Sequence, residues 1–572
     1  RVLMYLTPIY PQIPVKTLIF LTYNMQYGDK NAQSEVSMRI YQAAHHDTRV
    51  RDYLFTRRVI WSENTVNAGL LVGNREFQAQ ITSANPVTEI RTGGSLLLDF
   101  GIEFHGAVRF VTGSAAGKIR LRFGESVSEA MGCPDQDHAI HDAELVLPRM
   151  GMLEYGNTAF RFVRIDALDR NVRLINVHGV ALYRDQKVTG AFHSSDERLN
   201  RIWDTAIYTV RMNMQDFLYD GAKRDRLVFM GDLHPEAKAV FCAFDDVSIV
   251  PDSMDFIVSH SADTADMNRI RSYPFWWVIT LHDYYWRTAD ISYLVRQRDL
   301  LLELLAVFAG YVDSAGSEQV PECRFLDWPN REKTAAMHAG LQGLLFWALK
   351  CGEALCAVLD IAFPGAAADA VRRMKNHLPD CGDSKAAAAM LTLSGLKNRA
   401  DVVSRNRFSG VSTFFGYYML QALPTGPALE LIRRYWGAML DFGATTFWED
   451  FDLTWTRNAG RIDELPQPGK DDLHADFGNF CYKGLRHSLC HGWAAGPAPF
   501  LSERVLGVRF LEPGGRRIEV APELGGLEFV SGVVPSAFGP IRVTADAGGE
   551  VEVKAGENII VEISKEKEAL CA

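Results

Sequence analysis

SSDERLNRIWDTAIYTV, residues 194–210, marks a change in the hydrophobic pattern of this chain of 572 residues. Ser194 and Glu197 are spaced as in a capping box, which predicts that a helix begins here. The apolar residues that follow recur at helical spacing and predict one amphipathic helix. These apolar residues are Leu199, Ile202, Trp203, Ala206, Ile207 and Val210. The fold class depends on what lies on either side of this switch.

Before the switch, short runs from about residue 60 to 190 alternate between apolar and polar side chains. Examples are SLLLDFG at 95–101, GAVRFVT at 106–112 and FRFVRIDAL at 160–168. Alternation interrupted by glycine and polar turns is typical of antiparallel sheets packed as a sandwich. We therefore expect an N-terminal β-sandwich region over 1–190.

After the switch, helical spacing recurs for about 300 residues. With a mean helix of about 11 to 12 residues, this span holds roughly twelve helices, or six helical hairpins. A helical solenoid is the alternative, but the sequence shows no self-similarity at a fixed period, so a closed (α/α)6 barrel over 191–502 is predicted. The clearest helical patterns are at 237–243, 291–312, 338–357, 366–377, 412–423 and 428–440.

From Val505 the alternation returns, interrupted by Gly514-Gly515, Gly525-Gly526 and Gly548-Gly549. These turn signals between short apolar runs predict a small C-terminal β-sandwich over 503–572. The expected architecture is thus multidomain, with a central (α/α)6 barrel flanked by N-terminal and C-terminal antiparallel β-sandwich domains.

Composition excludes several classes of protein. Hydrophobic residues make up 47% and charged residues 23%, as in ordinary globular proteins. The net charge of -10 and the lack of a basic cluster argue against nucleic acid as a partner. Apolar runs such as Leu300–Val312 are shorter than the roughly 18 to 20 residues that cross a bilayer, so no membrane is expected.

Cysteine usage is the basis for the expected location. Nine cysteines are scattered without metal-ligand pairing or a disulfide framework, and they are predicted to be reduced and mostly buried. This favours the cytoplasm. The chain begins with Arg1, which leaves a signal peptide open.

Two acidic segments carry candidate chemistry. From Asp220 to Glu236 there are four carboxylates, three basic side chains and a histidine, with Pro235 suited to the first turn of a following helix. We expect a loop between two helices, and its arginines are able to tune the pKa of a carboxyl between them. Judged by its charge content alone, this segment is better interpreted as a solvent-exposed charged turn without catalytic function.

The second segment, Gly443–Asp452, interleaves carboxylates with aromatic rings. Aromatic faces beside carboxylates are typical of sugar sites, although a core loop with exposed acids has the same composition. Further aromatic and acidic stretches are expected in loops at 273–277, 282–286, 325–329 and 487–493, of which the Asp327-Trp328-Pro329 turn is the best defined.

Other catalytic classes lack their usual motifs. The chain has no HExxH, paired CxxC or EF-hand loop, and no Walker loop, dinucleotide-binding glycine motif or GxSxG elbow. We therefore expect neither a metal nor a cofactor.

DGAKRDRLVFMGD at 220–232, followed by GATTFWEDF at 443–451, resembles the bacterial α-L-rhamnosidases of glycoside hydrolase family 78. FGESVSEAM at 123–131, FLDWP at 325–329 and LRHSLCHGWAAGP at 485–497 extend the resemblance, which covers roughly residues 90 to 560. It implies a six-hairpin barrel with flanking β-sandwiches and an inverting hydrolase that removes terminal α-L-rhamnose from glycosides or oligosaccharides.

Position by position, the resemblance implies Asp225 as general acid and Glu449 as general base. The residues that it implies for holding the sugar are Asp220, Arg224, Asp232, Trp276, Asp327, Trp328, Trp448 and His491.

Two positions depart from the family pattern. Asp225 stands where many members have Glu, and Phe229 where many have Trp. Since Asp is one methylene shorter, a neighbour such as Glu236 is the alternative acid. A carbohydrate-binding protein that has lost catalysis, and another six-hairpin glycosidase or phosphorylase with a different sugar, remain alternative functions. The expected partner is a small-molecule glycoside or oligosaccharide, and a homodimer stays open.

Overall fold

The computed structural model describes residues 47–81, 86–132, 142–478, 480 and 482–564. All described residues from Thr48 onward belong to one compact unit. Residues 1–46 of the predicted N-terminal domain, and three of the nine cysteines, Cys133, Cys481 and Cys571, lie outside the described residues.

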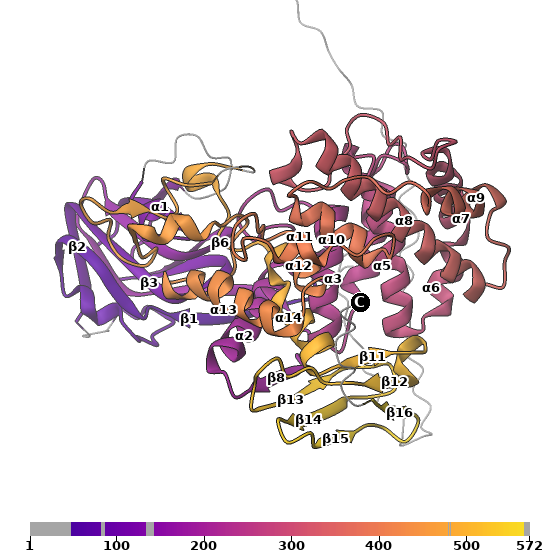
Figure 1. Cartoon of the computed structure of the whole chain (residues 1–572). Helices are drawn as coiled ribbons and strands as arrows, with labels where there is room; N and C mark the ends of the chain where they lie inside the picture. Colours follow the sequence, from indigo (N-terminus) through magenta and orange to yellow (C-terminus); the bar gives the residue numbers. More distant parts are fainter. Residues whose placement is uncertain (1–46, 82–85, 133–141, 479, 481, 565–572) are drawn as a thin grey trace, which may run out of the picture. The chain divides into compact units, whose positions relative to one another are not determined.

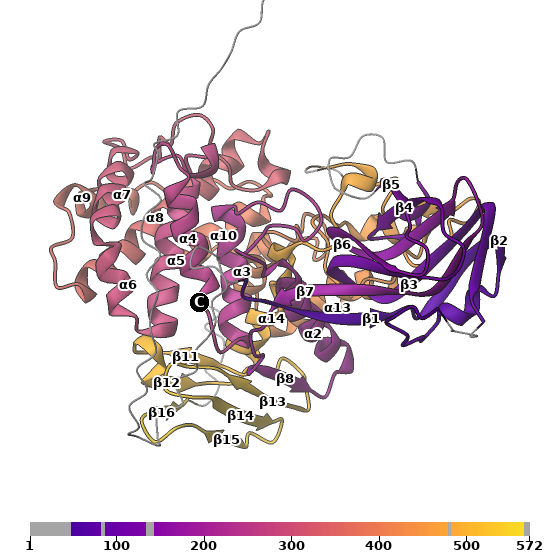
Figure 2. The ribbon, with the colours of Figure 1, turned by 180° about the vertical axis from the view of Figure 1, so that it is seen from behind.

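The strands predicted before residue 190 are present and are hydrogen-bonded into one seven-stranded network (Figures 1 and 2). Its order is β1-β7-β3-β6-β4-β5, with β2 paired to β3. Side chains of these strands fill an apolar cluster that includes Leu96, Leu98, Phe160 and Val163. The strands are β1 (Arg49–Phe55), β2 (Arg58–Val66), β3 (Thr88–Thr112), β4 (Lys118–Gly124), β5 (Asp142–Val146), β6 (Met152–Ala167) and β7 (Val172–Arg184).

The long strand β3 requires a glycine at its centre. Gly106 has φ of 151°, and a Cβ atom there would lie 1.9 Å from the carbonyl oxygen of Val180. Only glycine therefore allows β3 and β7 to approach this closely.

The switch at residue 194 is real, but its details differ from the prediction. Helix α2 runs over Glu197–Asn213, and its six predicted apolar residues are all buried. The predicted capping box is wrong, because Asp196 is the N-cap and accepts hydrogen bonds from the amides of Arg198 and Leu199. Ser194 ends strand β8 (Ala191–Ser194) instead. Aspartate is as good an N-cap as serine, so the spacing alone did not distinguish them.

Twelve α-helices, α2 to α13, lie between Glu197 and Asp441, a stretch that the structure describes throughout. Figures 1 and 2 show α3, α5 and α8 side by side within this helical region. The predicted helical pattern at 291–312 is divided into α6 and α7. After α2, the helices are α3 (Met230–Ala243), α4 (Ile249–Ser259), α5 (Tyr273–Thr288), α6 (Ile291–Arg296), α7 (Arg298–Gly310), α8 (Thr334–Val358), α9 (Gly365–Met374), α10 (Lys385–Leu393), α11 (Ala400–Ser404), α12 (Gly416–Gln421) and α13 (Thr425–Asp441).

Helix α8 is the one helix of the described chain that is long and apolar enough to cross a membrane. Its 25 residues lie inside the helical region, and 67% of its most apolar window is buried. Such burial is typical of a core helix.

The C-terminal strands form two small sheets, one of order β11-β12-β16 and one of order β15-β14-β13-β8. Strand β8 comes from the start of the helical segment and pairs with β13, so that Phe192 lies opposite Gly532. One apolar cluster runs from the helices into these strands. The remaining strands are β11 (Val508–Phe510), β12 (Arg517–Val520), β13 (Phe529–Val534), β14 (Ile541–Asp546), β15 (Val551–Lys554) and β16 (Ile560–Ile563).

The cysteines that the structure describes agree with the prediction of reduced thiols. All six are free, and five of them are buried, with Cys323 the exposed exception. Burial raises the pKa of the Cys242 thiol to about 12, so that this thiol is unreactive at neutral pH.

Candidate active site

The first acidic segment is hydrogen-bonded to a segment far away in the sequence. The amide of Ala222 donates to the carbonyl of Cys490 at 3.1 Å, and the amide of Gly492 donates to the carbonyl of Asp220 at 2.9 Å. Gly221 and His491 form an antiparallel bridge between these bonds. The backbone therefore places His491 beside the acidic segment.

The acidic segment is a loop only as far as Phe229, and the predicted loop up to Glu236 is wrong. Helix α3 begins at Met230 and includes Pro235 in its interior. Asp232 and Glu236 thus project from the first two turns of a helix, while Asp220 and Asp225 belong to the loop before it. The positive end of the helix dipole faces this group of carboxyls.

Three carboxyl groups of this segment are buried. Burial, together with the charge of Asp232, raises the pKa of Asp220 well above its usual range, and burial raises that of Asp232. Glu236 is 1% exposed, and burial beside Asp232 and Asp220 raises its pKa well above the usual range. Oε1 of Glu236 has no hydrogen-bond partner in the described part of the chain. A Cβ atom at Gly492 would lie 1.8 Å from this oxygen, so that a larger residue there would displace the Glu236 side chain.

His491 is the cation of this cluster. Its Nε2 lies 3.4 Å from Oδ1 of Asp232. Burial opposes a charge on the ring, but the ion pair with Asp232 and the charges of Glu449 and Asp220 outweigh it and raise the pKa of His491 to about 9. The imidazole is therefore protonated at neutral pH and partly compensates the surrounding carboxylates.

Asp225 and Arg226 lie in the loop and both have positive φ, 55° and 51°. This conformation is unusual for residues with side chains and persists only where the surroundings hold it. The hydroxyl of Tyr482 donates to Oδ2 of Asp225 at 2.6 Å, and the guanidinium of Arg486 lies 3.9 Å from Oδ1. The side chain of Asp225 is 30% exposed, in contrast to the buried carboxyls next to it.

Asp225 faces a polar cavity of about 190 Å³. The other residues that line this cavity are Arg49, His105, Asn157, Asp216, Tyr219 and Arg226.

The two basic residues before Asp225 are turned inward. The ammonium of Lys223 donates to Oε1 of Glu129 at 2.5 Å, and the guanidinium of Arg224 binds the same oxygen and the carbonyl of Leu485. Glu129 belongs to helix α1 (Val127–Met131), which follows strand β4. A buried carboxylate from the N-terminal part of the chain thus holds the loop on which Asp225 lies.

Glu449 lies in the second acidic segment, and both its backbone and its side chain are tied to Ser488. The amide of Ser488 donates to Oε2 of Glu449 at 3.1 Å, and the amide of Glu449 donates to the carbonyl of Ser488 at 3.0 Å. The carbonyl of Glu449 accepts from the indole of Trp493 at 3.0 Å and from the hydroxyl of Thr413. These bonds hold the carboxylate in one orientation.

Asp327 and Trp328 are brought to Glu449. All three line a cavity of about 10 Å³, together with Asp450 and Phe480. The hydroxyl of Ser412 donates to Oδ2 of Asp327 at 2.9 Å, and burial raises the pKa of Asp327 to about 7. The predicted turn at Asp327 is present as a 3-10 turn over Trp328–Asn330.

Two predicted sugar-binding tryptophans are fully buried. Trp276 was expected in a loop, but it lies in helix α5, with its ring stacked on His234 at 5.2 Å between ring centres. The predicted loop at 282–286 lies in the same helix. Trp448 packs edge to face on Phe451 at 5.5 Å. The indole nitrogens of Trp276 and Trp448 have no hydrogen-bond partner in the described chain.

Two residues of this region were not singled out from the sequence. Glu129 lies within the quoted stretch FGESVSEAM, where the run of polar residues after a strand was the available signal. Tyr482 lies in no recognisable motif. Only the chain path shows that it meets Asp225, because the two residues are far apart in the sequence.

The ligand atoms of Glu125, Glu129 and His474 lie within 4.8 Å of one another, a spacing that suits a cation. Lys223 and Arg224 already bind Glu129, and the hydroxyl of Ser126 lies 2.7 Å from Nδ1 of His474. Two positively charged side chains therefore already compensate the charge of Glu129.

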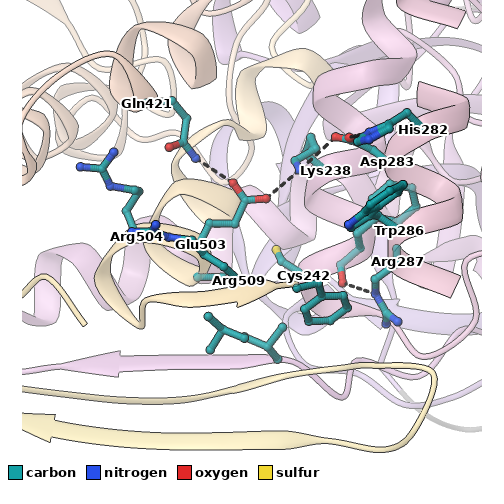
Figure 3. Close-up of a pocket in the computed structure, with 15 residues that line it drawn as sticks. Lys238, Cys242, His282, Asp283, Trp286, Arg287, Gln421, Glu503, Arg504 and Arg509 are labelled. Atoms are coloured by element: carbon teal, nitrogen blue, oxygen red, sulfur yellow. Dashed lines mark hydrogen bonds and ion pairs between the residues drawn. The ribbon is translucent and has the colours of Figure 1, made fainter. Parts of the chain in front are cut away.

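A larger cavity, of about 310 Å³, lies at the other ends of α3 and α5 (Figure 3). There the ammonium of Lys238 bridges Asp283 at 3.1 Å and Glu503 at 2.8 Å, and Arg287 lies at the end of α5. None of the predicted site residues lines this cavity.

Residues 187–336 match the model of the bacterial α-L-rhamnosidase six-hairpin glycosidase domain. This match covers the acidic loop, α3 and the Asp327 turn, but not Glu449. A search of curated proteins finds no match.

Several solved structures share the fold. A rhamnosidase of glycoside hydrolase family 78 from Bacillus sp. GL1 has a TM-score of 0.67 and 21% identity, over 85% of this chain and 54% of that one. A rhamnosidase from Klebsiella oxytoca with rhamnose bound has a TM-score of 0.64 and 20% identity, over 80% of this chain and 96% of that one.

An α-L-rhamnosidase from Streptomyces avermitilis complexed with L-rhamnose has a TM-score of 0.65 and 16% identity, over 84% of this chain and 50% of that one. The chain thus spans about half the length of the Bacillus and Streptomyces enzymes. The resemblance predicted from the sequence is confirmed: the chain has the fold of the family 78 α-L-rhamnosidases, and its residues 187–336 match their six-hairpin glycosidase domain.

Proposed function

We propose that the protein is an inverting glycoside hydrolase that removes terminal α-L-rhamnose from glycosides or oligosaccharides. The match over residues 187–336 and the shared fold support this proposal, as do the sugars bound in the Klebsiella and Streptomyces structures. In the same proposal, the helices form an (α/α)6 barrel between two β-sandwiches, with limits at 1–190, 191–502 and 503–572.

The observation that carries the proposal is the convergence of carboxyl groups from separate segments on one cationic histidine. Asp232, at the start of α3, lies 3.4 Å from the ring of His491. The carbonyl of Asp220, in the loop, accepts from the amide of Gly492, next to His491. Glu449, from the segment after α13, accepts from the amide of Ser488 on the same segment as His491. Pairs of carboxyls in different environments are the usual equipment of glycosidases.

Glu449 acts as the general base. In an inverting enzyme the base removes a proton from a water molecule, which attacks the anomeric carbon from the face opposite the leaving group. The cavity of about 10 Å³ beside Glu449 has room for about one water molecule. Because the amide of Ser488 holds Oε2 of Glu449, the carboxylate is oriented before the substrate binds.

Asp225 acts as the general acid and gives its proton to the glycosidic oxygen as the bond to the anomeric carbon breaks. The side chain of Asp225 is 30% exposed and lines the cavity of about 190 Å³, where a substrate can reach it. Glu236 is the alternative acid, because burial raises its pKa well above the usual range.

The sugar ring is held by the residues around these two carboxyls. His491, Asp220 and Asp232 offer charged hydrogen-bond partners to its hydroxyl groups, and Asp327, Trp328 and Trp448 flank Glu449. Arg224 acts through Glu129, and Trp276 acts indirectly, because its ring is buried in α5 against His234. The proposal also includes a cytoplasmic location, a small-molecule glycoside as substrate, and action without a cofactor.

The test is an assay with p-nitrophenyl glycosides of α-L-rhamnose, α-L-fucose, β-D-glucose and β-D-glucuronic acid, each with and without phosphate. The proposal expects hydrolysis of the rhamnoside that does not depend on phosphate. Release that requires phosphate would identify a phosphorylase, and preference for another sugar a different glycosidase. Calorimetric binding of L-rhamnose without any turnover would identify a binding protein.

A further inference from the structure

The carboxylate of Asp225 is held by a residue outside every predicted motif. Tyr482 donates its hydroxyl hydrogen to Oδ2 at 2.6 Å, and within the described chain this is the one hydrogen bond to the Asp225 side chain. The ring of Tyr482 is itself fixed, because the guanidinium of Arg486 lies 4.0 Å from its centre. Arg486 also lies 3.9 Å from Oδ1 of Asp225.

The other charged groups around Asp225 come from several elements. Arg226 follows it in the loop, and Asp232 at the start of α3 interacts with its charge. The titratable and charged side chains that share its cavity are Arg49, His105, Asp216, Tyr219 and Arg226. None of them is hydrogen-bonded to the Asp225 carboxylate, so the position of its two oxygens depends on Tyr482 and Arg486.

Tyr482 also interacts electrostatically with Glu449, the second proposed catalytic group. Burial, the hydrogen bond to Asp225 and the charge of Glu449 all raise the pKa of Tyr482, which keeps its hydroxyl protonated and able to donate. A tyrosine that remains a donor is suited to hold a carboxyl in both of its protonation states.

We propose that Tyr482 is the positioning residue of the general acid: it holds Oδ2 of Asp225, so that Oδ1 carries the proton that is delivered to the glycosidic oxygen. This inference rests on the proposed function. It adds Tyr482 to the residues to which that function assigns a role.

The consequence for the reaction follows from the proton balance. When the proton on Oδ1 passes to the leaving oxygen, the bond from that oxygen to the anomeric carbon breaks and Asp225 becomes a carboxylate. The hydrogen bond from Tyr482 then becomes charge-assisted and strengthens. An interaction that is stronger in the transition state than in the ground state raises kcat rather than substrate affinity.

The test is Tyr482→Phe, which removes only the hydroxyl group. From the usual strength of a hydrogen bond to a charged group, kcat on an aryl α-L-rhamnoside falls about 10- to 100-fold, while KM stays within about threefold. The basic limb of the pH–rate profile, which reports loss of the acid's proton, moves to higher pH by about one unit because the carboxylate has lost a donor.

The matched control is Tyr183→Phe. The hydroxyl of Tyr183 also donates to an aspartate, Asp52, but this pair joins strands β7 and β1 and does not line the cavity of Asp225 or that of Glu449. This variant keeps the wild-type kcat and the wild-type basic limb. If Tyr482→Phe fails to fold, as judged by its unfolding temperature, Tyr482→Gln retains an N–H donor at this position and gives an intermediate basic limb.

The outcomes separate the two proposals. An active wild type whose basic limb is unchanged in Tyr482→Phe overturns the role of Tyr482 alone. A wild type that hydrolyses no rhamnoside overturns the proposed function, and the role of Tyr482 with it.

Discussion

Glu449 and Ser488 exchange hydrogen bonds in both directions: the amide of Ser488 donates to Oε2 of Glu449 at 3.1 Å, and the amide of Glu449 donates to the carbonyl of Ser488 at 3.0 Å. The two residues lie on different segments, so the exchange joins the second acidic segment to the segment that carries His491. A carboxylate fixed in this way loses little freedom when the substrate binds, which favours catalysis.

Replacing Glu449 by Gln removes the proposed base but keeps an oxygen that accepts from Ser488. We expect kcat to fall by about 10²- to 10⁴-fold, the usual contribution of a general base, with KM changed little. Steady-state kinetics on an aryl α-L-rhamnoside measure this. Glu430→Gln is the control, because Glu430 is an exposed partner of Arg407, and its activity should equal that of the wild type. Equal loss in both variants would point to folding rather than to the base.

The choice between Asp225 and Glu236 as the acid is tested with leaving groups of different basicity. An acid is needed most when the leaving oxygen is basic. In Asp225→Asn, turnover of a methyl α-L-rhamnoside should fall far more than turnover of a 2,4-dinitrophenyl rhamnoside, whereas Glu236→Gln should slow both substrates by a similar factor. The opposite pattern would transfer the role of the acid to Glu236.

His491 should make the stability of the protein depend on pH. Its pKa is about 9 in the folded state, above the unfolded value of 6.5, so its contribution is fully present below pH 6.5 and is lost as pH rises through 9. The size is on the order of 3 kcal/mol at most. The difference in free energy of unfolding between wild type and His491→Gln should therefore shrink between pH 6.5 and 9.5. A difference that is constant with pH would show that the histidine is neutral in the folded protein.

Glu129 should be costly to remove, since Lys223 and Arg224 are both buried against it. Glu129→Gln leaves two buried cations without their carboxylate, and we expect a loss of about 3 to 5 kcal/mol in the free energy of unfolding, measured by urea titration. Glu144→Gln breaks the exposed pair with Lys118 and should cost less than about 1 kcal/mol. Similar costs in both variants would mean that the loop does not depend on Glu129.

The periodic features of the fold followed from the sequence, because burial of one face requires a regular pattern of side chains. The apolar face of α2 is where the helical spacing predicted it, and the C-terminal strands are where the alternation predicted them. The residues at which helices begin did not follow from the sequence, because neighbouring residues carry equivalent start signals. Asp196 and Ser194 are both good N-caps, and Pro235 is tolerated inside α3, so neither helix start was determined by residue type.

The candidate site, like the fold, was predicted from the sequence only in part. Motif resemblance singled out Asp220, Asp232, His491 and Glu449 as candidates, and the backbone pairing of Gly221 with His491 brings two of their segments together. Trp276 belonged to an aromatic stretch that read as a loop but is the buried face of α5. Tyr482 and Glu129 were missed because their roles arise from contacts between distant parts of the chain, which no local pattern encodes.

The stereochemistry of the reaction tests the central claim most directly, that two carboxyls on opposite faces of the sugar act in a single displacement. An aryl α-L-rhamnoside is incubated with the protein, and the anomeric proton of the released sugar is followed by NMR before mutarotation. The account predicts that β-L-rhamnose appears first. First-formed α-L-rhamnose would contradict it, because retention requires a covalent intermediate on one carboxylate in place of a water activated by Glu449.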